Sequence, residues 1–109
     1  MAQTLKILGQ SNPGATTLTD FYTVPALTKT VVSSIIVCNR SATATSFRVS
    51  VAIAGAGDTP AQYLYYDNTL AGNDTFVATI GLSLGATDVV RCYATLATLS
   101  FNLMGAENT

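Results

Sequence analysis

Hydrophobic and polar residues alternate along most of this 109-residue chain, in short runs separated by turn residues. Successive side chains of a β-strand point to opposite faces, so this alternation predicts strands with one face in a core. The pattern is clearest in residues 45–54, where one face is expected to carry Phe47, Val49, Val51 and Ile53. No long segment repeats apolar residues every three or four positions. We therefore expect essentially no α-helix.

About eight segments show strand signals: residues 4–8, 17–24, 29–38, 45–54, 62–67, 75–80, 87–93 and 96–103. Pro and Gly mark turns between several of them, because Pro cannot donate to a strand ladder and Gly tolerates positive φ. Residues 81–85 are expected to form a short crossover and residues 108–109 a free tail. Strands at this spacing predict an all-β fold, a single compact, jelly-roll-like β-sandwich of about eight short antiparallel strands.

The segment of residues 29–38 differs from the other predicted strands. It reads KTVVSSIIVC, so apolar residues occupy successive positions and fall on both faces. A strand covered on both sides shows this pattern. We therefore expect it to be covered on both faces.

The N-terminal segment has two interpretations. Leu5, Ile7 and Leu8 form a short apolar run, which a Ser-Asn-Pro-Gly turn at residues 11–14 separates from the rest. An exposed apolar edge strand associates with other strands unless it is paired. Residues 1–17 are therefore either an edge strand of the same sandwich or an N-terminal arm that docks on a neighbouring chain, while residues 18–109 form the β-sandwich domain. The three apolar residues are candidate interface residues.

An aromatic cluster is the second candidate interface. Strict alternation places Tyr63 and Tyr65 on one strand face, with Leu64 and Tyr66 on the other. Tyrosine is amphipathic, is enriched at interfaces and stacks on sugars. The alternative is a partly buried sandwich face whose phenol groups reach solvent.

The charge balance limits the classes of partner. The chain has 5 Lys or Arg residues, 6 Asp or Glu residues and a formal net charge of −1. This balance predicts neither nucleic acid nor a membrane surface as a partner. No secretory signal or membrane-spanning segment is evident, so we expect cytosolic synthesis, with Cys38 and Cys92 as unpaired thiols. Only 10% of residues are charged, which favours a surface covered by copies of the chain or by a partner.

Side chains for catalysis and metal binding are scarce. Without histidine, the chain cannot form a Ser-His-Asp or Cys-His arrangement, and two cysteines do not make a zinc site. Asp67, Asp74 and Asp88 are a conceivable acid-base set, but turn carboxylates usually accept bonds from nearby backbone N–H groups. Calcium ligation by Asp67, Asn68, Asn73 and Asp74 is a weak alternative, because the spacing does not fit an EF-hand loop. We expect no enzymatic activity, no catalytic or metal-binding residues and no cofactor.

An ordered series of short phrases resembles small virion proteins of tailed bacteriophages. The phrases are YTVPA (22–26), VVSSIIVCNRS (31–41), YLYYD (63–67), AGNDTF (71–76), TDV (87–89) and LSFNLMG (99–105). The resemblance covers nearly the whole chain after its first 17 residues. In that group the phrase after Pro-Ala is commonly Gly plus a basic residue, whereas this chain has Leu27, Thr28 and Lys29. The difference falls in a turn and leaves the predicted strands unchanged.

The resemblance implies a non-enzymatic virion component, assembled in the host cytoplasm, and carries over no catalytic residues. Such proteins include head decoration (cement) proteins and small tail or fibre modules. Our first hypothesis is a capsid decoration protein that stabilises the assembled head by binding the major capsid protein or other virion proteins, as a homo-oligomer with a trimer favoured. The alternatives are a tail, baseplate or fibre module that contacts the host surface, and an unrelated carbohydrate-binding β-sandwich.

Overall fold

A computed structural model describes residues 2–109 of the chain. Its strands are β1 (Gln3–Ser11), β2 (Thr19–Thr23), β3 (Lys29–Asn39), β4 (Thr45–Ala52), β5 (Tyr63–Leu70), β6 (Thr75–Leu84), β7 (Val89–Ala94) and β8 (Leu99–Asn108). Two short 3₁₀ turns, η1 (Ile53–Gly55) and η2 (Pro60–Gln62), lie between β4 and β5. Residues 2–109 contain no α-helix, as the alternation predicted.

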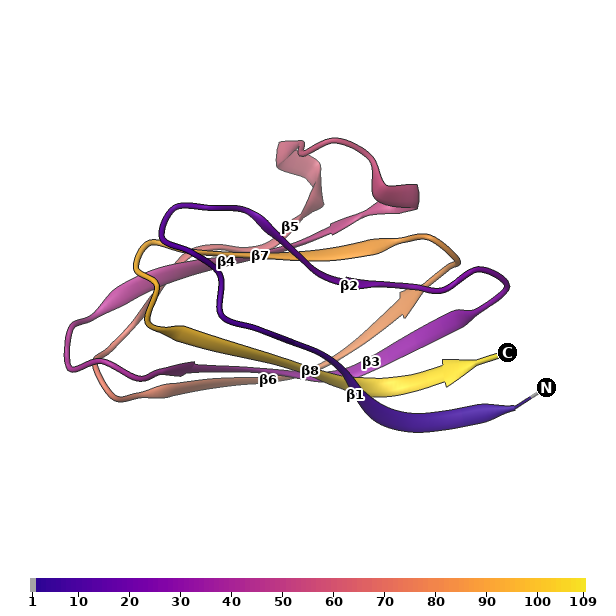
Figure 1. The fold of residues 1–109 in the computed structure, drawn as a ribbon, viewed down its shortest axis with the longest axis horizontal. Helices are drawn as coiled ribbons and strands as arrows, with labels where there is room; N and C mark the ends of the chain where they lie inside the picture. The colour runs from indigo at the N-terminus through magenta and orange to yellow at the C-terminus, as the bar shows by residue number, and fades with distance from the viewer. Residues whose placement is uncertain (1) are drawn as a thin grey trace.

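The strands form two antiparallel four-stranded sheets that pack face to face (Figure 1). Sheet I has the order β1-β8-β3-β6, and sheet II has the order β2-β7-β4-β5. The chain changes sheet at every connection except that from β4 to β5, which pair with each other. This order of strands is that of a jelly roll. The predicted all-β, jelly-roll-like sandwich is therefore confirmed.

The core between the sheets receives side chains from every strand. Phe47 of β4 lies among aromatic rings of sheet I, with its ring centroid 5.1 Å from Phe76 of β6 and 6.1 Å from Phe101 of β8. Phe21 of β2 meets Phe101 edge-on at 5.9 Å. Fully burying such a side chain stabilises a fold by about 1.5–3 kcal/mol, and tilted or edge-on ring contacts add to this. These rings hold sheet II against sheet I.

The strand β3 is covered on one face, so the expectation of cover on both faces was wrong. Val32, Ile35 and Val37 are fully buried in the core, whereas Val31 on the outer face is exposed. Near Ser33 the pairing of β3 with both β6 and β8 shifts by one residue. Such a β-bulge inserts an extra residue and resets the alternation. Apolar residues therefore occupy successive positions for two reasons: the bulge shifts which positions face the core, and the outer face of β3 is itself apolar.

The strand β4 ends before the predicted alternation does. Phe47 and Val49 are buried in the core, as expected. Ile53, predicted on the same face, instead begins η1 and is exposed. The next residue, Ala54, has a φ of 53°, which is incompatible with an extended strand. The chain therefore turns away from sheet II at this point.

Two segments predicted to be irregular are strand. Most of residues 81–85 belongs to β6, because a bulge near Gly81 lets the strand continue to Leu84. Residues 108–109 are not a free tail: β8 extends to Asn108, and the Thr109 N–H donates to the Ala2 carbonyl at 2.9 Å. Backbone pairing, which the local sequence does not reveal, explains both corrections.

The N-terminal segment pairs within the same chain. β1 runs antiparallel to β8 at the edge of sheet I, with a bulge between Ile7 and Gly9. The bulge places Leu8 in the core, and Gly9 lies so close to β2 that a Cβ there would come within 2.7 Å of the Phe21 carbonyl oxygen. In the single chain, residues 3–11 therefore form an edge strand of the same sandwich, which is one of the two interpretations of this segment. Docking of this segment on a neighbouring chain stays a prediction.

Both cysteines are free thiols, as predicted. Cys92 of β7 is fully buried. Burial raises the pKa of its thiol to about 11. Because the thiolate is the reactive form, Cys92 is a core residue rather than a nucleophile.

Leu27 occupies a strained position in the turn between β2 and β3. Its φ is 58°, in the left-handed region that favours glycine, and its side chain is 93% exposed. The strands on either side form as predicted, so the strained backbone is confined to the turn.

We predict that Leu27→Gly raises the free energy of unfolding by about 0.5–1 kcal/mol, because it relieves the left-handed strain and loses no buried contact. Urea unfolding would measure the change. Leu27→Ala is the matched control, since it shortens the side chain but keeps the Cβ that causes the strain. A Gly variant less stable than the Ala variant would contradict this explanation.

Asn39, at the end of β3, holds several loops at one end of the sandwich. Its side-chain amide donates to the carbonyls of Thr43 and Ala71 at 2.9 and 3.2 Å. Its side-chain oxygen accepts bonds from the Ser41 N–H and the Thr98 hydroxyl at 3.1 and 3.2 Å. The residue is only 1% exposed. Water does not readily reach these polar groups, so they depend on Asn39 for their hydrogen bonds.

We predict that Asn39→Ala lowers the free energy of unfolding by about 2–4 kcal/mol, because it leaves several partly buried backbone groups without partners. Denaturant unfolding would measure the loss. The exposed Asn12 gives the matched control, Asn12→Ala, with an expected change within about 0.5 kcal/mol. Equal stability of the two variants would show that Asn39 does not organise these loops.

Candidate functional site

Four of the six candidate interface residues lie on the two opposite outer faces of the sandwich, whereas Leu8 is buried in the core and Tyr65 packs against it. Leu5 and Ile7 are exposed on sheet I. Tyr63 and Tyr66 lie on the outer face of sheet II, where their rings meet edge-on at 5.0 Å. The two groups therefore belong to separate surfaces.

The first surface is the apolar face, the outer side of sheet I. Strand register brings together on it six apolar side chains: Leu5, Ile7, Val31, Ile36, Val77 and Met104. Leu5 is 79% exposed and Val77 is 59% exposed. Leu5, Val31 and Met104 also line a shallow groove of about 460 Å³ across β1, β8 and β3.

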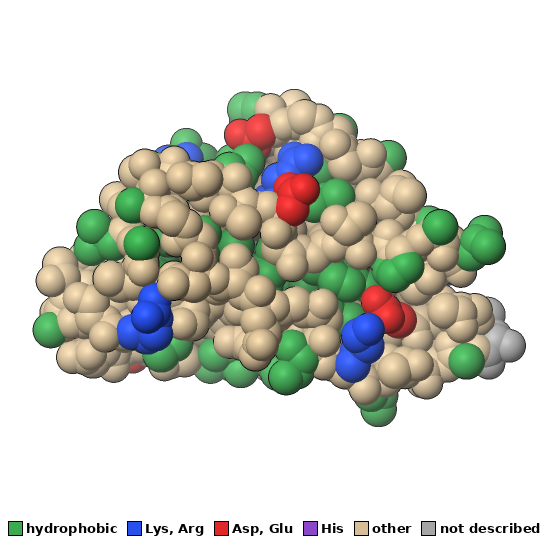
Figure 2. All heavy atoms as spheres, viewed as in Figure 1, with side chains coloured by type: hydrophobic (Ala, Val, Ile, Leu, Met, Phe, Trp, Pro, Cys, Tyr) green, Lys and Arg blue, Asp and Glu red, His purple; other side chains and the backbone are tan. Residues whose placement is uncertain are grey.

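Charge is nearly absent from the apolar face. Among the described strand residues of sheet I, only Lys29, at the end of β3, alternates onto it. Lys6, which also contributes to the lining of the groove, alternates to the opposite side with Glu107, and the two pair at 3.1 Å. Glu107 also accepts a bond from the Tyr22 hydroxyl. These bonds hold the pKa of Glu107 below its ordinary value, with the Tyr22 bond as the largest cause. Figure 2 views the sandwich from its edge, and most of the surface visible there is uncharged.

The three tyrosines are arranged differently from strict alternation. Tyr65 points inward and packs against Phe76 at 5.2 Å, whereas Tyr66 shares the outer face with Tyr63. The prediction that Tyr63 and Tyr65 share a face was therefore wrong. The cause is a shift in the pairing of β5 with β4, where Leu64 is the extra residue between two paired positions.

The second surface is the tyrosine cleft, a hollow of about 380 Å³ lined by Arg48, Asp58, Thr59, Pro60, Tyr63 and Tyr66. The Arg48 guanidinium lies 4.1 Å from the Tyr66 ring centroid and 4.4 Å from that of Tyr93. It also donates to Asp67 through Nε at 2.6 Å. This bond raises the pKa of Arg48 above its ordinary value. Arg48 is thus a fixed cation stacked between two rings.

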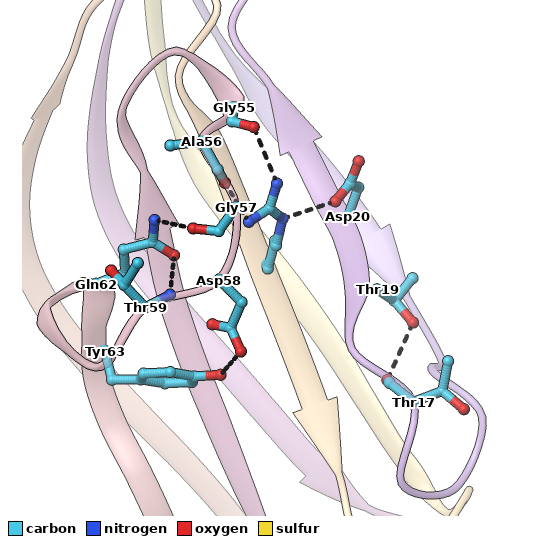
Figure 3. Close-up of polar contacts among 11 residues, drawn as sticks. Thr17, Thr19, Asp20, Gly55, Ala56, Gly57, Asp58, Thr59, Gln62 and Tyr63 are labelled. Atoms are coloured by element: carbon cyan, nitrogen blue, oxygen red, sulfur yellow. Dashed lines mark hydrogen bonds and ion pairs between the residues drawn. The ribbon is translucent and has the colours of Figure 1, made fainter.

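The connection between β4 and β5 forms one wall of the tyrosine cleft and rises above sheet II (Figure 1). Arg91 of β7 anchors it by donating to the carbonyls of Gly55 and Ala56 at 3.4 and 2.8 Å. Figure 3 shows these carbonyls and Asp20 turned toward the same guanidinium. The Arg91 contacts therefore fix the base of this connection.

Within this connection, Asp58 is held in place by Tyr63. The Tyr63 hydroxyl donates to Asp58 Oδ2 at 3.0 Å (Figure 3). Burial, and then this bond, raise the pKa of Tyr63 above its ordinary value. Tyr63 therefore stays protonated near neutral pH and keeps donating to Asp58.

The remaining candidate carboxylates lie apart. Asp67 pairs with Arg48, Asp74 accepts a bond from the Thr75 N–H, and Asp88 accepts bonds from two backbone N–H groups. They therefore do not form the conceivable acid-base set. Residues 2–109 hold no group of three or more His, Cys, Asp or Glu side chains suited to a metal ion. Within the same residues, no helix is long and apolar enough to cross a membrane.

Comparison with known proteins adds no assignment. The sequence matches no protein-family model and no curated protein. The geometry of the two outer faces is therefore the evidence from which function is inferred.

Sequence reasoning identified Tyr63 and Tyr66 but missed Arg48 and Asp58. Arg48 alternates outward between core residues of β4, so its face was predictable. Its position over Tyr66 depends on the bulge in β5, which no local pattern marks. Asp58 lies in a Gly-rich connection, whose path over sheet II depends on Arg91.

We predict that Arg91→Ala speeds amide hydrogen exchange across residues 53–62 by about tenfold or more, because charge-assisted bonds to this connection are lost. Hydrogen-exchange mass spectrometry would measure the rate. Arg40→Ala is the matched control, since Arg40 donates to the Ala97 carbonyl elsewhere. Unchanged exchange in the Arg91 variant would show that other contacts fix the connection.

Proposed function

We propose that this protein is a non-enzymatic structural protein of a bacteriophage virion, most directly a decoration (cement) protein that stabilises the assembled head. The observation that carries this proposal is the apolar face of sheet I, which exposes several large apolar side chains on rigid, paired strands. Contiguous exposed apolar surface is uncommon on monomers and marks interaction sites. Its expected partners are the major capsid protein, other virion proteins and further copies of the chain.

The composition of the apolar face suits repeated docking on a large shell. A face with almost no charge loses little solvation free energy when it is covered. Each contact need contribute only a few kcal/mol, because many copies act on one particle and binding stabilises the state that is bound.

The sequence resemblance supports the same proposal. Two of the phrases shared with phage virion proteins, at residues 31–41 and 99–105, fall in β3 and β8. These are the two central strands of sheet I. The resemblance therefore includes the strands that carry the centre of the apolar face.

The test is addition of the purified protein to phage particles that lack it. We expect wild-type protein to cosediment with the particles, gold-labelled protein to appear on the head in negative stain, and heat-induced DNA release to require a higher temperature. The double variant Val31→Glu/Val77→Glu places two charges on the apolar face and should bind at least about tenfold more weakly. Both side chains are exposed, so circular dichroism should show an intact fold.

Tyr66→Ala, on the opposite outer face, is the control and should bind the head like wild type. Label on the tail would instead support the alternative of a tail, baseplate or fibre module. Absence of binding to any part of the particle would contradict the virion proposal. The homo-oligomer, with a trimer favoured, remains part of the proposal, and sedimentation equilibrium measures that state directly.

A further inference from the structure

We propose that the tyrosine cleft binds a neutral saccharide ring, with Tyr66 as the stacking surface and Arg48 and Asp58 as hydrogen-bonding groups. The tyrosine cleft lies on sheet II, on the side opposite the apolar face. The inference therefore goes beyond the proposed docking on a particle and does not depend on it.

Tyr66 is an exposed aromatic side chain whose orientation is fixed by its neighbours. Its side chain is 57% exposed, although Arg48 lies 4.1 Å from its ring centroid. Tyr63 meets it at 5.0 Å with an angle of 89° between the rings, so the two rings form a corner. A sugar ring has an apolar C–H face that packs on such a surface, while its rim of hydroxyl groups needs polar partners.

Two charged side chains of the cleft lining offer polar partners. Arg48 uses Nε and Nη2 for Asp67, which leaves Nη1 without a hydrogen-bond partner among the described residues. Asp58 accepts the Tyr63 hydroxyl at Oδ2, and its Oδ1 likewise has no partner within residues 2–109. A rigid donor and a rigid acceptor match adjacent sugar hydroxyls, each of which both donates and accepts.

The charges select a neutral ligand. Arg48 is offset by Asp67, and Asp58 adds a further negative charge, so the lining and its partner carry a net charge of about −1 at neutral pH. An anionic sugar or a phosphate would therefore meet Asp58. A polyol without charge is not repelled by Asp58.

The experiment is a glycan array that presents neutral oligosaccharides of glucose, galactose and mannose beside sialylated, phosphorylated and amino sugars. We expect wild-type protein to bind neutral members. Tyr66→Ala should reduce this binding by about tenfold or more, because the stacking surface is removed. Tyr66→Phe keeps the ring and should stay within about threefold of wild type. Val77→Ala, at a position of nearly equal exposure on the opposite face, is the matched control and should change nothing.

Three results would overturn the proposal: no binding to any neutral sugar at the highest protein concentration, binding confined to charged sugars, or neutral binding that Tyr66→Ala leaves unchanged. Circular dichroism of each variant checks that the sandwich is intact. Particle attachment is measured separately and depends on the apolar face, so either proposal can fail while the other stands.

Discussion

The contact of Phe47 with Phe76 and Phe101 is the interaction on which the arrangement of this protein depends. Phe47 belongs to sheet II and the other two rings to sheet I, so their packing fixes how one sheet lies on the other. Both candidate surfaces are the backs of these two sheets. Removing a core aromatic typically costs about 3–5 kcal/mol, a large share of the stability of a domain of this size. The surfaces therefore exist only while these rings hold the layers together.

The sequence was sufficient to predict the fold class but not every position within it. Alternation at Phe47, Val49, Leu99, Phe101 and Leu103 correctly indicates inward-facing strand residues, because a buried face constrains each of these positions. Leu64 and Ser33 show where alternation fails to predict the face of a side chain. Each lies at a bulge, and a bulge is set by the partner strand rather than by local sequence. One extra residue reverses the alternation, which is why Tyr63 and Tyr65 were wrongly predicted to share a face.

The few charged residues are used almost entirely to fix local structure. Arg91 pairs with Asp20 and holds the β4–β5 connection, Arg48 pairs with Asp67, and Lys6 pairs with Glu107 at the edge of the sandwich. Exposed ion pairs of this kind contribute little to stability, at most about 1 kcal/mol each. Their stronger effect is geometric, because a planar guanidinium fixes the groups that it bonds. Two of the three pairs lie on sheet II, so that face is polar and shaped while the outer side of sheet I stays apolar.

Because the two faces differ in this way, the two proposed binding surfaces lie on opposite sides of the protein. In a two-layer sandwich the outer faces point in opposite directions, with only the core between them. If sheet I is covered by a particle, sheet II must face away from it, and the tyrosine cleft then lies on the solvent side. Docking and saccharide binding therefore do not compete for surface. A weak single-site affinity would also suffice for the tyrosine cleft, since many copies on one particle would present it at high effective concentration.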